Sequence, residues 1–155
     1  MTSAACRSRE RNDRNTITIP LWILLGFAAW TLAVLFGSVG VYRWSRILAG
    51  RASIREWRAD AVQGADWYQR AMRAHMNCVE NLPVYGAVAL TAFATGATGA
   101  GLDRFAITFF GARVCQSLVH MALPQSEPIA AVRFALYFMQ VLCMIAMGVM
   151  IVLHL

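Results

Sequence analysis

Hydrophobic residues fall in four long stretches along the chain, separated by short polar segments. The first two stretches predict membrane-spanning helices from Ile19 to about Arg46 and from Trp67 to Ala97. The last two predict helices from about Leu102 to Leu123 and from about Ile129 to Leu153. Each reaches the roughly 20 residues that an α-helix needs to cross the hydrocarbon core of a bilayer. The pattern therefore predicts an all-α fold, an integral membrane four-helix bundle.

The segments outside these stretches are too short to form a second folded domain. Residues 1–18 predict a disordered polar tail, and residues 19–155 predict a single helical domain. Between the second and third helices, Gly96–Gly101 predicts a short turn. Pro83 lies inside the second helix, where its ring and its missing N–H predict a kink.

The composition agrees with a membrane protein. Of the 155 residues, 59% are hydrophobic and 14% are charged, whereas a soluble domain has about 25% charged residues. The net charge is +6, and all 14 basic residues are arginines. The absence of lysine, together with abundant alanine and arginine, is typical of a GC-rich bacterial genome, which favours a bacterial inner membrane as the location.

Half of the arginines lie between Val41, where the first uninterrupted apolar run ends, and Leu82, where the second begins. Under the positive-inside rule, this distribution predicts that the first loop is cytoplasmic. These arginines do not form one basic strip with interleaved aromatic residues, so we expect no nucleic-acid partner. The four cysteines lack the spacing of a metal site, and we expect no bound metal. The seven arginines are Arg43, Arg46, Arg51, Arg55, Arg58, Arg70 and Arg73.

Each of the last three predicted helices carries polar residues three or four positions apart. At about 100° per residue, such residues share one helical face. We expect the three faces to line one polar cavity that is rich in arginine, which suits carboxylates or a thiolate. The residues are Arg73, Asn77 and Glu80 on the second helix, Arg113, Gln116, Ser117 and His120 on the third, and Arg133, Tyr137 and Gln140 on the fourth.

Purely structural roles are the alternative for some of these residues. Glu80 can pair with Arg73 or Arg113 to hold the bundle together, but one carboxylate cannot balance all the cations, which favours an anionic ligand. His120 and Tyr137 can serve as anchors at the membrane interface or belong to the site.

The segment from Arg73 to Pro83 reads Arg-Ala-His-Met-Asn-Cys-Val-Glu-Asn-Leu-Pro. It resembles the second-helix signature of the MAPEG family, the membrane-associated proteins in eicosanoid and glutathione metabolism. Ala112-Arg113-Val114, and Arg133 followed by Tyr137, resemble the family's elements on the third and fourth helices. The resemblance covers roughly Ile19 to Val152 and is nearest to the microsomal glutathione transferase and prostaglandin E synthase branch.

The resemblance implies a homotrimer with three glutathione sites at its subunit interfaces, opening to the cytoplasm. By this resemblance, Arg133 faces the glutathione sulfur, Tyr137 contacts the peptide, and His75 supports the site, although helical geometry puts His75 on another face. Arg73, Asn77 and Glu80 hold the charged ends of glutathione, with help from Arg113. His120 stands where close relatives carry a tyrosine that contacts glutathione, and Phe134 stands where the prostaglandin synthases carry a serine.

The function implied is that of a membrane-bound glutathione transferase, with or without peroxidase activity. Its partners are glutathione, a lipophilic electrophile that arrives through the bilayer, and membrane lipid. The alternative is a non-catalytic MAPEG-like lipid-binding or scaffold protein. A four-helix drug-efflux carrier for cations agrees less well with the charges of the predicted cavity, because such a carrier needs an unpaired acidic residue rather than surplus arginines.

Overall fold

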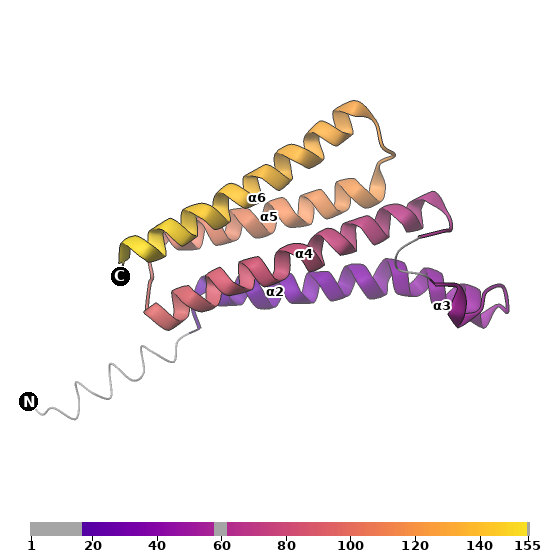
Figure 1. Ribbon diagram of the computed structural model, residues 1–155, viewed down its shortest axis with the longest axis horizontal. Helices are drawn as coiled ribbons and strands as arrows, with labels where there is room; N and C mark the ends of the chain where they lie inside the picture. The colour runs from indigo at the N-terminus through magenta and orange to yellow at the C-terminus, as the bar shows by residue number, and fades with distance from the viewer. Residues whose placement is uncertain (1–16, 58–61, 155) are drawn as a thin grey trace, which may run out of the picture.

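The computed structural model describes residues 17–57 and 62–154, and it is helical without strands over that part of the chain (Figure 1). The predicted all-α four-helix bundle is confirmed. Residues 1–16 of the predicted N-terminal tail lie outside the described residues. The elements are α2 (Ile19–Val34), η1 (Leu35–Gly40), α3 (Val41–Leu48), η2 (Ile54–Glu56), α4 (Asp66–Thr95), α5 (Ala100–Ala122) and α6 (Glu127–His154).

The first helix is continuous through α2, η1 and α3, a length of 30 residues. Its middle segment, η1, is π-helical, which the sequence did not predict. Just before it, the Thr31 hydroxyl donates to the carbonyl of Phe27 at 2.8 Å, and Ser38 within it donates to the carbonyl of Val34. Such side-chain bonds compete with the regular helical ladder. Beyond η1, α3 carries Arg43 and Arg46 at the end of the span.

Three helices are long and apolar enough to cross a membrane, namely Ile19–Leu48, Ala100–Ala122 and Glu127–His154. Helix α4 also has sufficient length, at 30 residues. Its mean hydropathy is lower than that of the other three helices, because its first half carries the charged residues Asp66, Arg70, Arg73 and Glu80. Helix α4 continues through Pro83 without interruption. The missing N–H of that proline removes only one helical bond, to the carbonyl of Val79.

The core lies where α5 packs against α2 and α4. The Tyr85 and Phe109 rings stack with their centres 4.3 Å apart, and Phe27 meets Phe109 edge-on at 5.4 Å. Small buried residues on α4 and α5, such as Ala89 and Ala106, permit the close helix contact that packing in a bilayer requires.

The order of the helices gathers the polar segments at one end of the bundle. Helices α2 and α4 lie side by side, while α6 packs on the far side of α5 (Figure 1). The start of α4, the end of α5 and the start of α6 meet at the same end as α3 (Figure 1). Most of the polar residues singled out in the sequence belong to these three helix ends.

Candidate functional site

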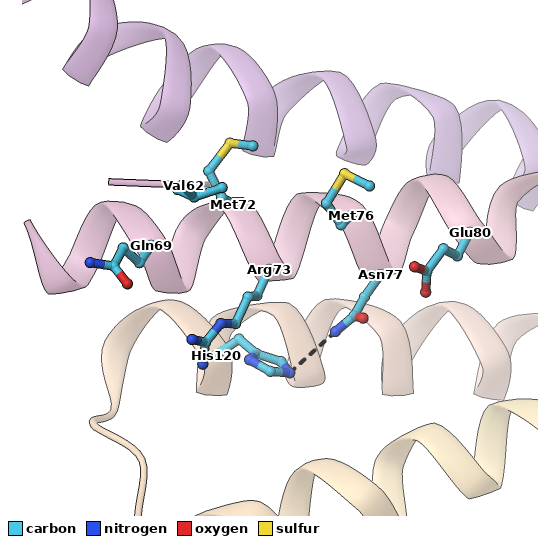
Figure 2. Close-up of a pocket in the computed structure, with 8 residues that line it drawn as sticks. All are labelled: Val62, Gln69, Met72, Arg73, Met76, Asn77, Glu80 and His120. Atoms are coloured by element: carbon cyan, nitrogen blue, oxygen red, sulfur yellow. Dashed lines mark hydrogen bonds between the residues drawn. The ribbon is translucent and has the colours of Figure 1, made fainter. Parts of the chain in front are cut away.

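Helix α4 carries a polar stripe that faces α5. Arg73, Asn77 and Glu80 are four and three residues apart, so they share one side of the helix. Figure 2 shows Arg73 and Asn77 pointing toward His120 of α5, whereas Met72 points away toward the first helix. Asn77 Nδ2 lies 3.2 Å from His120 Nε2, and this hydrogen bond joins the two helices.

A hollow of about 400 Å³ opens between α4, α5 and α6 at this end of the bundle. Six of the eight site residues predicted from the sequence line it: Arg73, Asn77, Glu80, His120, Arg133 and Tyr137. The remaining wall consists of Gln116, Gln125, Ala130 and Phe134. An adjoining hollow of about 450 Å³ shares Arg73, Asn77, Glu80 and His120, and adds Val62, Gln69, Met72 and Met76 (Figure 2). Residues from three helices therefore meet around one polar space.

Arg133 is held between α5 and α6 and is only 7% exposed. Its Nη2 donates to the carbonyl of Leu123 at 2.9 Å and lies 3.5 Å from that of Val119. Val119 lies in the last turn of α5, where its carbonyl also accepts from the N–H of Leu123 at 3.2 Å, and Leu123 is the C-terminal cap residue of the helix. The helix dipole favours a cation at this end. One side of the guanidinium thus caps α5, and the side chain also lines the hollow.

Gln116 connects Arg133 to the interior of the bundle. Its Nε2 donates to the main-chain carbonyl of Arg133 at 3.0 Å. Its Oε1 accepts from Arg113 Nη1 at 2.9 Å and from Gln140 Nε2 at 3.1 Å. Because Arg113, Gln116 and Gln140 are all buried, these bonds lie in a low-dielectric environment that strengthens them. The network fixes α5 against α6 directly beneath the hollow.

The other two predicted site residues do not line the hollow. Arg113 is fully buried, and its guanidinium carbon lies 5.9 Å from the centre of the Phe27 ring. Its Nε and Nη2 have no hydrogen-bond partner within the described part of the chain. His75 is directed toward the first helix, close to the backbone of Thr31, as helical geometry predicts.

Comparison with known proteins identifies the family of this bundle. The model of the MAPEG family matches residues 19–153, a range that includes all four helices and both hollows. The chain belongs to the MAPEG family. No curated protein and no solved structure matched it. MAPEG membership, with three helices able to span a bilayer, makes this an integral membrane protein and supports a general role in glutathione or eicosanoid metabolism.

The hollow of this MAPEG protein has a surplus of positive charge. Arg73 and Arg133 line it together with one carboxylate, that of Glu80. Glu80 is exposed, and Arg73 Nη1 donates a hydrogen bond not to Glu80 but to Gln125 Oε1, at 3.2 Å. Two buried nitrogens, Arg133 Nε and His120 Nδ1, find no partner among the described residues. This arrangement suits a ligand that carries more anionic than cationic groups.

Three residues that line the MAPEG hollow, Gln125, Ala130 and Phe134, were not among the polar residues predicted to form it. Gln125 lies in the turn between α5 and α6, outside any helix, so helical spacing carries no signal for it. Phe134 follows Arg133 directly and is exposed beside the hollow. Its position next to an intramembrane arginine, and the family resemblance that singled it out in place of a serine, were the available signals.

Proposed function

We propose that this MAPEG protein is a membrane-bound glutathione transferase that activates glutathione as a thiolate for attack on lipophilic electrophiles. One observation carries the proposal. Arg73 and Arg133, with Asn77, Glu80 and Tyr137, converge on one hollow at the polar end of a membrane bundle. Family members use glutathione, and the proposal follows the microsomal glutathione transferase branch that the second-helix segment resembles.

Glutathione has two carboxylates and one ammonium group, so its charges complement two arginines and one glutamate. In this proposal, Arg73 binds a carboxylate, Glu80 binds the ammonium group, and Asn77 bonds to a peptide amide. Tyr137 and His120 contact the peptide from α6 and α5. Arg113 and His75 act from inside the bundle, where they support the helices that carry the binding residues.

Arg133 is the proposed catalytic residue. Its Nη2 is committed to the carbonyl of Leu123, which leaves Nη1 to meet the glutathione sulfur. A free thiol has a pKa of about 8.5, and a neighbouring guanidinium favours the thiolate, which is the nucleophile. The thiol proton leaves to solvent, a carbon–sulfur bond forms, and the electrophile releases its leaving group as an anion. With a lipid hydroperoxide, two glutathione molecules give an alcohol, water and glutathione disulfide.

The assembly and orientation follow from the family and from the charge pattern. MAPEG proteins generally form trimers, and the proposed enzyme is a homotrimer with glutathione sites at its subunit interfaces. The arginine-rich first loop faces the cytoplasm of a bacterial cell, with the protein in the inner membrane. The apolar substrate reaches the site laterally from the bilayer.

The proposal is tested by titrating the detergent-purified protein with glutathione while recording near-ultraviolet absorbance. We expect a saturable thiolate signal at neutral pH. Once an electrophile is added, we expect a conjugate to form more slowly than the thiolate signal appears. Binding without the thiolate signal contradicts the transferase proposal and indicates a non-catalytic family member. Absence of binding by calorimetry as well contradicts a glutathione site altogether.

Replacing Glu80 by Gln is expected to weaken glutathione binding about tenfold, because a charge-assisted hydrogen bond to the ammonium group is lost. The dissociation constant is measured by calorimetry in detergent. Glu127→Gln, an exposed carboxylate at the start of α6, is the matched control and should bind normally. If Glu80→Gln instead lowers the melting temperature and the folded fraction binds glutathione normally, Glu80 has a structural role.

A further inference from the structure

A separate groove of about 760 Å³ lies between α5 and α6, away from the polar hollow. Its lining includes Arg104, Phe105 and Thr108 of α5, and Leu142, Ile145 and Ala146 of α6. Arg104 and His120 are 16 positions apart on one helix, which corresponds to about 24 Å along its axis. The groove is therefore near the opposite membrane surface from Arg133.

The walls of the groove face outward from the bundle. Phe105, Leu142 and Ile145 are exposed large hydrophobic residues, Ile145 to 57% of its surface. They belong to two helices able to span a membrane, so hydrocarbon chains are their natural neighbours. The groove is concave, and a single acyl chain lying in it makes more contacts than it can make on a flat helical face.

Arg104 gives the groove a charged end. It is exposed and stands one turn above Thr108, on the same side of α5. It is the fifth residue of the helix, about 6 Å from its start along the axis, a depth from which a long side chain reaches the headgroup layer. Among the described residues that line the groove there is no carboxylate. A guanidinium in that setting pairs well with a phosphate.

We propose that this groove binds an anionic phospholipid, with the phosphate on Arg104 and an acyl chain along Phe105, Leu142 and Ile145. The combination of an apolar channel with one cation at its membrane-surface end matches the two parts of such a lipid. A purely apolar ligand leaves Arg104 unpaired, and a soluble anion leaves the channel unfilled. The site is independent of the proposed transferase chemistry, since it shares no residue with the polar hollow.

The test is native mass spectrometry of the full-length protein, incubated in detergent with phosphatidylglycerol or with phosphatidylcholine of the same acyl chains. We expect the wild-type protein to retain more phosphatidylglycerol. Arg104→Gln should lower that retention about fivefold, to the level of phosphatidylcholine. Arg51→Gln, an exposed arginine of the first loop, should retain phosphatidylglycerol as the wild type does. Equal retention of the two lipids by the wild type, or an unchanged preference in Arg104→Gln, overturns the proposal.

A second variant tests the channel rather than the charge. Ile145→Trp adds a ring at an exposed position in the groove and should lower retention of both lipids, while helicity measured by circular dichroism stays unchanged. If Ile145→Trp instead alters the oligomeric mass and leaves lipid retention as it was, the groove is covered by another copy of the chain. That outcome overturns the lipid site.

Discussion

Replacing Arg133 by Ala is expected to lower kcat/KM for conjugation by at least about 100-fold and to abolish the thiolate absorbance of bound glutathione. The variant loses the cation that favours ionised sulfur, so the pKa of the bound thiol rises toward about 8.5. At neutral pH most of the bound glutathione is then protonated. The residual activity should therefore climb between pH 7 and pH 9, which a pH–rate profile measures.

Because Arg133 also caps α5 through the carbonyl of Leu123, folding has to be checked separately. Circular dichroism and the oligomeric mass in detergent show whether Arg133→Ala keeps the bundle. Arg133→Lys keeps a charge at the site and should restore part of the thiolate signal. The control Arg51→Ala changes an exposed arginine of the first loop and should alter neither quantity. A thiolate signal that persists in Arg133→Ala contradicts the assignment of Arg133 as the catalytic residue.

The positions of the helices were largely predictable from the sequence, because a bilayer imposes a minimum length on each hydrophobic stretch. The predicted start of the first span at Ile19 agrees with α2. A turn separates α4 from α5 where one was predicted, although α5 begins at Ala100, so the last two residues of the predicted turn belong to the helix. The π-helical segment Leu35–Gly40 was not predicted. Its apolar residues fit an α-helix equally well, and only local hydrogen bonding distinguishes the two forms.

The polar hollow was predictable for a similar reason, since helical spacing fixes which residues share a face. Helical spacing does not determine which neighbouring residues a side chain contacts at its position along the helix axis. Arg113 and His120 are seven positions apart, so they lie within about 20° of each other but about 10 Å apart along the axis. His120 lines the hollow, whereas Arg113 lies deeper, where Phe27 and Gln116 enclose it. The helical pattern gave both residues the same role for this reason.

The burial of Arg113 makes the stability of the bundle depend on Gln116. Replacing Gln116 by Leu is expected to lower the free energy of unfolding by about 3–5 kcal/mol, because it leaves a buried charge without its acceptor. Arg113 donates to Gln116 Oε1 at 2.9 Å, and its Nε and Nη2 have no partner in the described part of the chain. Gln140 loses the same acceptor but keeps its bond to the carbonyl of Leu136 at 2.8 Å.

The measurement is denaturant unfolding in detergent, monitored by circular dichroism. The double variant Arg113→Leu with Gln116→Leu should recover much of the lost stability. It replaces the polar pair with apolar side chains, whereas Gln116→Leu alone leaves Arg113 without its acceptor. Gln63→Leu, at an exposed position of the first loop, should change stability by no more than about 0.5 kcal/mol. If the double variant is as unstable as Gln116→Leu alone, the loss arises from the bond between Gln116 and the carbonyl of Arg133. Gln116 would then act chiefly by holding α6 in place, and the charge of Arg113 would not depend on it.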